Sequence, residues 1–374
     1  MRIMITGGGT GGHTSPALAV IEELQRRDPM LVLQWVGRRG NIEERLCRDR
    51  AIPFRGLPVE GWPRKRGLRQ AWVGLKLAWC MMRAWMLLRR FQPQVVFGVG
   101  GYVALPIGYM AQRMGIPTVL HEQNQLLGMT NRILAPKATR LYLSYPETRG
   151  AYPEDRAEVV GNPVRAGFIT PPSREAAREA LDFDPTIPVV LVVGGSQGAH
   201  RLNAAMIAVV RELGEREAQV LWMTGQADAA EARSAAGQSA ARVEVFAFID
   251  DMPQAFAAAD LVVSRAGASS TAEIAAMGRP SILVPYPHAT DNHQEENARA
   301  FEERHAAVVL LDHDCTGERL VLLLRELLGD PKHLETMGHA AASLAVPAAA
   351  ERIVEGILAL VFEAAQQAEE TVHL

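Results

Sequence analysis

The chain has 374 residues, a formal net charge of −3 and 48% hydrophobic residues, which describes a globular protein long enough for two domains. Its three cysteines, Cys47, Cys80 and Cys315, have neither paired nor metal-ligand spacing, which argues against a disulfide scaffold or a zinc site and for a reducing compartment. The first residues pass from one arginine into a short apolar run and then glycines, not into a signal peptide, so we expect a cytoplasmic protein.

Strands and helices are predicted to alternate along the chain, a pattern typical of parallel sheets with helices on both faces. In the first half, strands are expected near residues 2–6, 31–36, 94–98, 117–120 and 140–143, and helices near 16–27, 41–49, 68–91, 103–114 and 128–135. In the second half, strands are expected near 188–193, 219–224, 243–247, 261–264, 281–284 and 307–310, and helices near 201–214, 227–236, 252–257, 270–277, 292–304, 316–328, 331–343 and 348–367. The predicted fold class is α/β, with two Rossmann-like, doubly wound domains that each begin with a strand, a glycine loop and a helix.

The first glycine loop, GGGTGGH over residues 7–13, follows the first predicted strand. Three of its glycines fit G-x-G-x-x-G, but the second strand ends in Arg38-Arg39 and lacks the acid that binds a dinucleotide ribose. An NADP-dependent oxidoreductase therefore remains an alternative. His13 favours a transferase that deprotonates a sugar hydroxyl, because histidine titrates near neutral pH. The other interpretation of His13 is that it only caps a helix starting at Pro16.

A basic, tryptophan-rich segment without any Asp or Glu lies between Glu60 and Glu122. The helix expected over 68–91 is apolar on several faces, but it contains Lys76 and Arg83, each of which would cost about 2.5–3.5 kcal/mol near a bilayer centre. We therefore expect this helix to lie at the headgroups of an anionic leaflet and not to span the membrane. The residues expected to make that contact are Trp72, Leu75, Lys76 and Trp79. The alternative is a wholly buried structural helix whose cations reach solvent at their tips.

The boundary between the domains is expected near Asn162-Pro163. This gives an N-terminal domain of residues 1–163, completed by a C-terminal helix over 347–374, and a C-terminal domain of residues 164–346. Open α/β sheets bind ligands at the carboxyl ends of their strands, so a ligand-binding cleft is expected between the two domains.

The second domain repeats the glycine loop at residues 194–198, a shape that holds an anion against backbone amides and a helix N-terminus. Farther on, Ser269, Ser270 and Glu273 fall in the first turns of a predicted helix, where hydroxyls suit phosphate oxygens and a carboxylate suits the vicinal hydroxyls of a ribose. Glu273 could instead be an ordinary first-turn acid. The stretch HQEEN over residues 293–297 then offers groups for sugar hydroxyls. Together these features predict a nucleotide-sugar ligand.

Six motifs in this order resemble one family: GGGTGGH, GVGGYVALP, HEQNQLLGMTNRILA, GNPVR, GGSQGAHRLN and SRAGASSTAEIAAMGRPSILVPYPHATDNHQEENA. The family is that of the bacterial inverting glycosyltransferases of GT-B fold that convert lipid I to lipid II in peptidoglycan synthesis. They transfer N-acetylglucosamine from UDP-N-acetylglucosamine (UDP-GlcNAc) to the C4 hydroxyl of the lipid-linked muramyl-pentapeptide. The resemblance covers essentially the whole chain.

The resemblance implies a role for each matching residue, with His13 as the base that deprotonates the acceptor hydroxyl. Donor contacts implied in this way are Thr10, Gly11, Gly12, Asn124, Arg165, Ser196, Gln197, Ile249, Ser269, Ser270, Glu273 and Gln294. Acceptor-side candidates are Gly8, Gly9, Tyr102 and Glu122. Glu295 and Glu296, which follow Gln294, depart from the matched pattern and carry no assigned role.

The implied partners are UDP-GlcNAc, lipid I, the anionic cytoplasmic leaflet of the inner membrane and other cell-wall synthesis enzymes. No nucleic acid, metal ion or organic cofactor is expected. Asp312 and Asp314 have the spacing of an Asp-x-Asp metal motif, but they follow the last strand and are expected to cap the next helix.

Two further alternatives share parts of this pattern. A UDP-GlcNAc epimerase would need acids for proton transfer and would have little use for a tryptophan-rich basic helix. A membrane adaptor without enzyme activity would use the helix but not His13.

Overall fold

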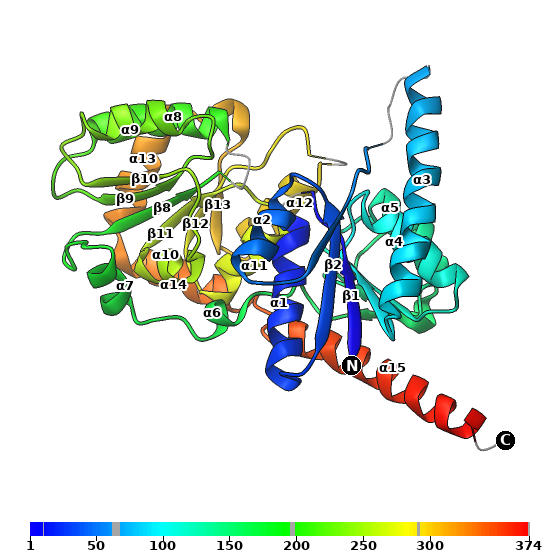
Figure 1. Cartoon of the computed structure of the whole chain (residues 1–374). Helices are drawn as coiled ribbons and strands as arrows, with labels where there is room; N and C mark the ends of the chain where they lie inside the picture. Colours follow the sequence, from blue (N-terminus) through cyan, green and yellow to red (C-terminus); the bar gives the residue numbers. More distant parts are fainter. Residues whose placement is uncertain (10, 62–67, 195–198, 290–291, 373–374) are drawn as a thin grey trace. The chain divides into compact units, whose positions relative to one another are not determined.

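The computed structural model describes residues 1–9, 11–61, 68–194, 199–289 and 292–372. The chain divides into two compact α/β units, one formed by Met1–Arg165 with Ala348–Leu374 and the other by Ala166–Pro347. The sequence-based boundaries at residues 163 and 346 lie beside these divisions. All described strand pairings are parallel, as expected for doubly wound sheets (Figure 1).

The first unit contains a 7-stranded sheet in the order β3-β2-β1-β4-β5-β6-β7. Its strands are β1 (Arg2–Thr6), β2 (Val32–Arg38), β3 (Phe54–Leu57), β4 (Val95–Gly98), β5 (Thr118–Glu122), β6 (Arg140–Leu143) and β7 (Ala157–Val159). Its helices are α1 (Gly11–Arg27), α2 (Ile42–Asp49), α3 (Leu68–Phe91), α4 (Ala104–Arg113), α5 (Met129–Leu134) and α15 (Ala349–Val372). In the centre of the sheet, Ile3 pairs with Leu33 of β2 on one side and with Val95 of β4 on the other.

The second unit contains a 6-stranded sheet in the order β10-β9-β8-β11-β12-β13. Its strands are β8 (Val189–Val193), β9 (Gln219–Met223), β10 (Val243–Phe246), β11 (Leu261–Ser264), β12 (Ser281–Leu283) and β13 (Ala307–Val309). Its helices are α6 (Ala166–Ile169), α7 (Arg174–Ala180), α8 (His200–Glu212), α9 (Ala229–Ala236), α10 (Met252–Ala258), α11 (Ala268–Ala276), α12 (His293–Glu303), α13 (Gly317–Leu328) and α14 (Pro331–Ala342). The central strand β8 is buried at every residue, as is typical of a parallel strand covered on both faces.

The structure corrects two expected helix starts. Helix α1 begins at Gly11, so His13 lies within its first turn, and the interpretation that His13 caps a helix starting at Pro16 is wrong. Helix α13 is capped by Thr316, whose Oγ1 accepts a hydrogen bond of 3.3 Å from the backbone N–H of Arg319. The expected capping by Asp312 and Asp314 is therefore also wrong, and both residues lie in a separate 3₁₀ turn.

Helix α3 packs beside α4, and its first turns project beyond the other elements of the first unit (Figure 1). The side chains of Val73, Cys80, Ala84 and Leu88 are buried and form the face that packs on the unit. The other side of the helix exposes large apolar side chains, namely those of Trp72, Leu75, Trp79, Met82, Trp85 and Met86. The alternative of a wholly buried structural helix is therefore wrong.

Helix α15 packs against α1 and completes the core of the first unit (Figure 1). Ile353, Val354 and Ile357 are fully buried in the same apolar cluster as Ile3 and Ile5 of β1. The expectation that the last helix returns to the N-terminal domain is met by these contacts. Gly356 lies where α15 passes the fully buried Tyr142, and a Cβ atom there would overlap the tyrosine hydroxyl.

Gly356→Ala should therefore destabilise the protein although alanine is the better helix former. Overpacking of a well-packed core costs about 1–3 kcal/mol, which exceeds the gain of about 1 kcal/mol expected for glycine to alanine in a helix. Urea unfolding of the purified protein measures the difference. Gly74→Ala in α3 is the matched control, because no atom lies within 4 Å of the added Cβ, and it should stabilise the protein slightly. Equal behaviour of the two variants would contradict the packing argument.

Candidate functional site

The first glycine loop leaves β1 at the carboxyl edge of the first sheet. Gly7, Gly8 and Gly9 all have positive φ angles of 142°, 144° and 98°. A Cβ atom at Gly7 would overlap the Val99 side chain, and one at Gly8 would overlap the carboxylate of Glu43. Only glycine fits these positions, and the loop runs directly into the N-terminus of α1. Such an arrangement of backbone amides can hold an anion.

Glu43 of α2 is a residue of this loop region that the sequence analysis did not single out. Its side chain is fully buried, and its carboxylate accepts hydrogen bonds from the backbone N–H groups of Gly9 at 3.1 Å and Arg38 at 2.8 Å. A buried carboxylate is tolerated when it receives such charge-assisted bonds. Glu43 therefore fixes the first glycine loop against the end of β2. The sequence shows only an acid in the first turn of a helix, which is common and carries no signal of burial.

The imidazole of His13 is half-buried and faces the loop after β4. A Cβ atom at Gly100 would lie 3.0 Å from Cδ2 and 3.2 Å from Nε2 of His13, and 3.9 Å from Nδ2 of Asn131. Gly100 thus makes room for the imidazole beside the first turn of α5. Tyr102, in the same loop, is 49% exposed.

Glu122 ends β5 and is buried, with both carboxylate oxygens in hydrogen bonds. One oxygen accepts from the backbone N–H and the side-chain amide of Asn124, both at 3.1 Å. The other accepts from the N–H of Gly128 and from Nδ2 of Asn131, both at 2.9 Å. Through these hydrogen bonds Glu122 holds the loop that carries Asn124 in place.

His121 lies next to this network and is completely buried. Its Nε2 lies 3.1 Å from the carbonyl oxygen of Gly161 and its Nδ1 lies 2.9 Å from Nε2 of Gln123, which is consistent with a neutral ring protonated at Nε2. Burial lowers the pKa of His121 to about 4, the hydrogen bond to Gly161 opposes this shift, and the charge of His13 adds to it. His121 is therefore neutral at physiological pH.

The candidate donor residues of the second unit gather where β11 and β12 end. Helix α11 starts after Gly267, with Ser269 buried and Ser270 and Glu273 half-buried in its first turns. The side-chain oxygen of Gln294, at the start of α12, accepts a hydrogen bond of 3.0 Å from the N–H of Tyr286, and its Nε2 lies 4.0 Å from a Cβ atom built on Gly267. The structure thus brings the starts of α11 and α12 together.

For the other predicted site residues, the structure shows fewer contacts with the candidate site. Ile249 follows β10, and its N–H donates a 3.4 Å hydrogen bond to the Met223 sulfur at the end of β9. Arg165 is half-buried and is the last residue of the first unit before the chain enters the second. Gly11 and Gly12 are half-buried in the first turn of α1. Thr10, Ser196 and Gln197 lie outside the described residues.

Arg265 is a second residue that the sequence analysis missed. It follows β11, is only 9% exposed and donates to the carbonyl oxygens of Val284 at 3.1 Å and Pro285 at 3.3 Å. Its guanidinium also forms an ion pair of 2.6 Å with Asp312 and lies over the Tyr286 ring. Arg265 therefore fixes Val284 and Pro285 directly after β12, and Asp312 of the Asp-x-Asp motif is its ion-pair partner.

The exposed face of α3 combines indole rings with cations. Lys76 lies over the Trp72 ring at 5.6 Å, Arg83 over Trp79 at 4.9 Å and Arg89 over Trp85 at 4.7 Å. Lys76 also forms an ion pair with Glu60, so part of its charge is compensated.

No helix among the described residues has the length and apolarity needed to cross a membrane. The described residues also contain no cluster of three or more His, Cys, Asp or Glu that could hold a metal ion.

Comparisons with known proteins agree with both halves of this arrangement. Residues 3–143 match the glycosyltransferase family 28 N-terminal domain, and residues 189–353 match the corresponding C-terminal domain. A protein of Desulfitobacterium hafniense strain Y51, named UDP-N-acetylglucosamine–N-acetylmuramyl-(pentapeptide) pyrophosphoryl-undecaprenol N-acetylglucosamine transferase, is 42% identical over 95% of this chain and 98% of its own. A Lactiplantibacillus plantarum protein of the same name is 38% identical over the same shares.

Solved structures of related fold match nearly the whole chain. A crystal structure of Acinetobacter baumannii MurG covers 96% of this chain and 99% of its own with a TM-score of 0.72 and 29% identity. The UDP-GlcNAc 2-epimerase of Neisseria meningitidis, bound to UDP-GlcNAc, has a TM-score of 0.64 but only 11% identity, with coverage of 96% and 100%. The epimerase therefore shares the fold alone.

The buried His121 should make the protein less stable in acid. The unfolded chain binds a proton near pH 6.5 and the folded protein only near pH 4, so stability falls as the pH drops through this interval, by on the order of 3 kcal/mol. Urea unfolding at several pH values should show a shallower decline for His121→Gln than for the wild type between pH 6.5 and 4. His333→Gln, at an exposed histidine of α14, is the control and should keep the wild-type slope. Parallel curves for all three proteins would rule out this role of His121.

Proposed function

Since the chain belongs to the family of UDP-N-acetylglucosamine–N-acetylmuramyl-(pentapeptide) pyrophosphoryl-undecaprenol N-acetylglucosamine transferases, we infer that it is a hexosyltransferase that converts lipid I to lipid II. The observation that carries this inference is identity of up to 42% over nearly the full length of both chains, with both glycosyltransferase domains matched. The epimerase and oxidoreductase alternatives have no comparable support, because the epimerase likeness is one of fold only.

We propose that His13 is the base of the reaction. It would take the proton from the C4 hydroxyl of the muramyl sugar while that oxygen bonds to the anomeric carbon of the donor and the bond to UDP breaks. Attack opposite the leaving group inverts the anomeric centre. The neutral state of His121 supports this role, because a neutral neighbour does not oppose protonation of His13. Gly8, with Tyr102 nearby, would contribute to binding of the acceptor diphosphate. The backbone N–H of Gly9, the other candidate of this loop, already donates to Glu43.

The donor UDP-GlcNAc would bind mainly to the second unit. Glu273 is assigned to the ribose, Gln294 to the N-acetylglucosamine and the backbone of Ile249 to the uracil. The amides and hydroxyls at the start of α11, with the guanidinium of Arg165, would stabilise the charge of the leaving diphosphate. We accordingly assign neither a metal ion nor an organic cofactor to the transfer.

We also propose that the exposed face of α3 binds the cytoplasmic leaflet that holds the lipid acceptor. Two observations support this: the apolar side chains on that face have no cover in the first unit, and the indoles carry adjacent cations. Indole rings favour the interface between headgroups and acyl chains, and cations favour anionic headgroups.

His13→Ala should lower the transfer rate by about 10²-fold or more, because a positioned general base contributes roughly that much. The measurement follows label from radiolabelled UDP-GlcNAc into a short-chain lipid I analogue, with UDP binding determined in parallel. UDP affinity should be unchanged, and His333→Ala, at an exposed histidine of α14 outside the named sites, should transfer at the wild-type rate. Wild-type transfer by His13→Ala would remove the base assignment. If the wild type binds UDP but transfers nothing, the acceptor assignment fails as a whole.

Replacing Trp72, Leu75 and Trp79 together with serine should weaken binding to vesicles containing phosphatidylglycerol by at least about tenfold, because each side chain loses its apolar burial in the interface. Co-flotation with vesicles measures the effect. A matched control replaces Met30 and Phe362, which are 83% and 68% exposed elsewhere on the first unit, with serine. Equal losses in both variants would show that general surface apolarity, and not the face of α3, binds the membrane.

A further inference from the structure

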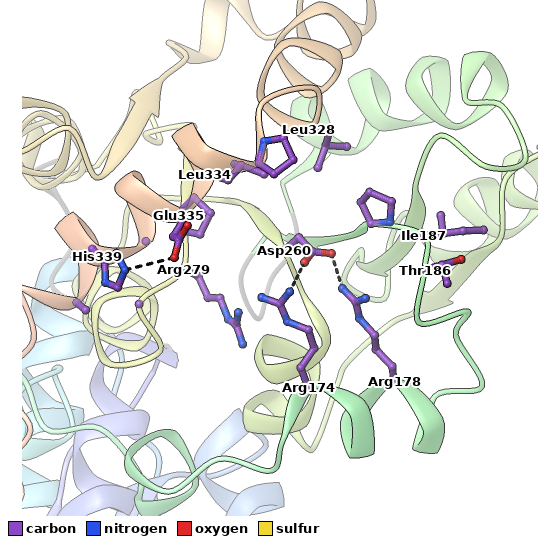
Figure 2. Close-up of a pocket in the computed structure, with 16 residues that line it drawn as sticks. Arg174, Arg178, Thr186, Ile187, Asp260, Arg279, Leu328, Leu334, Glu335 and His339 are labelled. Carbon is purple, nitrogen blue, oxygen red and sulfur yellow. Dashed lines mark hydrogen bonds and ion pairs between the residues drawn. The ribbon is translucent and has the colours of Figure 1, made fainter.

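A cavity of about 580 Å³ lies within the second unit, at the edge of the sheet opposite to the candidate donor residues (Figure 2). Its floor is formed by residues that precede strands, namely Pro188 before β8, Asp260 before β11 and Pro280 before β12. Its walls come from α7 and α14. Ser269, Glu273 and Gln294 all follow the carboxyl ends of strands β11 and β12, so the cavity is separate from the donor site.

Two arginines of α7 meet one carboxylate at this cavity. Arg174 forms an ion pair of 2.9 Å with Oδ1 of Asp260, and Arg178 bonds to Oδ2 of the same residue (Figure 2). Asp260 also accepts a 2.7 Å hydrogen bond from the N–H of Val189. Arg178 is nearly buried and is held by the carbonyl oxygens of Ala258 and Pro185, whereas the side chain of Arg174 is 46% exposed. Asp260 is therefore fully engaged, and Arg174 retains access to the cavity.

Arg279 adds a third guanidinium to the cavity wall. One of its terminal nitrogens donates a 3.0 Å hydrogen bond to the carbonyl oxygen of Ala257, but its buried Nε has no partner among the described residues. Figure 2 draws it beside Arg174 with no interaction line to Asp260. Burial, followed by the charge of Arg174, lowers the pKa of Arg279 to about 10. The site thus contains a cation whose charge the surrounding protein does not neutralise.

The charges around this cavity do not balance. Its inner wall has the three cations Arg174, Arg178 and Arg279 against the single anion Asp260. Glu335 and His339 lie at the rim and are 74% and 81% exposed, so solvent screens them. The remaining wall is largely apolar and includes Ile187, Leu328 and Leu334. Even with Glu335 counted beside Asp260, the three arginines leave a net positive charge beside an apolar wall, which matches a ligand with an anionic head and an apolar body.

We propose that this cavity binds a small organic phosphate monoester, with the phosphate held by Arg174 and Arg279 and the organic part against Ile187, Leu328 and Leu334. A phosphate monoester carries close to two negative charges at neutral pH, and arginine binds its oxygens through geometrically matched pairs of N–H groups. The cavity volume falls within the range of about 300–1,000 Å³ that is typical of small-molecule sites. The charge of the Arg279 guanidinium, which shares the nearby carboxylate of Asp260 with Arg174 and Arg178, would attract the phosphate.

The experiment is isothermal titration of the full chain with phenyl phosphate and with inorganic phosphate, in the presence of saturating UDP to occupy the donor site. Phenyl phosphate should bind more tightly than inorganic phosphate, because the ring adds contact with the apolar wall. Arg174→Gln and Arg279→Gln should each weaken phenyl phosphate binding about tenfold, which corresponds to about 1.4 kcal/mol. Arg174→Gln tests the proposal even where Arg279→Gln affects folding, since Arg174 is half-exposed.

Arg325→Gln is the matched control, because Arg325 is a partly exposed arginine of the same unit that pairs with Glu217 outside the cavity. It should bind phenyl phosphate as the wild type does. The proposal is overturned if neither phosphate binds in the millimolar range, if Arg174→Gln binds as tightly as the wild type, or if UDP displaces phenyl phosphate. The last outcome would place the binding at the donor site. None of these results depends on lipid I transfer, so the function proposed above is tested separately.

Discussion

Parallel pairing of every described strand is the constraint on which the rest of this molecule depends. A parallel strand must be followed by a crossover before the next strand can pair, so all loops that lead from strand to helix leave one edge of each sheet. His13 and Glu273 lie just past such loops, in the two units. Loops that lead from helix to strand leave the other edge, which in the second unit carries Asp260 and Arg279. The candidate donor site and the arginine-lined cavity therefore lie at opposite ends of the short strand β11.

Buried carboxylates set the shape of the first unit's loops. Glu43 bonds the amide of Gly9, and Glu122 bonds the amides of Asn124 and Gly128. Burial of a carboxylate is unfavourable unless such donors compensate it, so each loop is held in one conformation by a strong local requirement. The loops around His13 are accordingly ordered by the protein itself before any ligand binds. Under the proposed mechanism, loops held in this way would need little reorganisation when charge develops in the transition state.

The sequence predicted the two sheets well because their central strands are continuous apolar runs between strong helix patterns. It missed β3 and β7, which are short edge strands with polar residues such as Arg55 and Glu158, and it started α1 too late because glycines are poor helix formers. Motif positions such as Glu273 and Gln294 could be proposed because their neighbours along the chain mark them. Glu43 and Arg265 were not, because their roles arise from contacts with residues distant in sequence, and no local pattern distinguishes an inward-facing acid from a solvated one.

Helix α3 shows how structure can separate a residue's role in folding from its role in function. The buried face formed by Val73, Cys80, Ala84 and Leu88 fixes the helix on the first unit, and Cys80, Ala84 and Leu88 belong to its apolar core. The indoles of Trp72, Trp79 and Trp85 on the other face stay 58%, 42% and 38% exposed, and this remaining exposure to water is unfavourable. Each of these rings pairs with a neighbouring cation. At an anionic membrane surface the ring would lie at the level where headgroups meet acyl chains, and the cation would lie beside the headgroup charges. The exposed face of α3 is therefore not required by the fold, which is the reason for proposing that it binds the membrane.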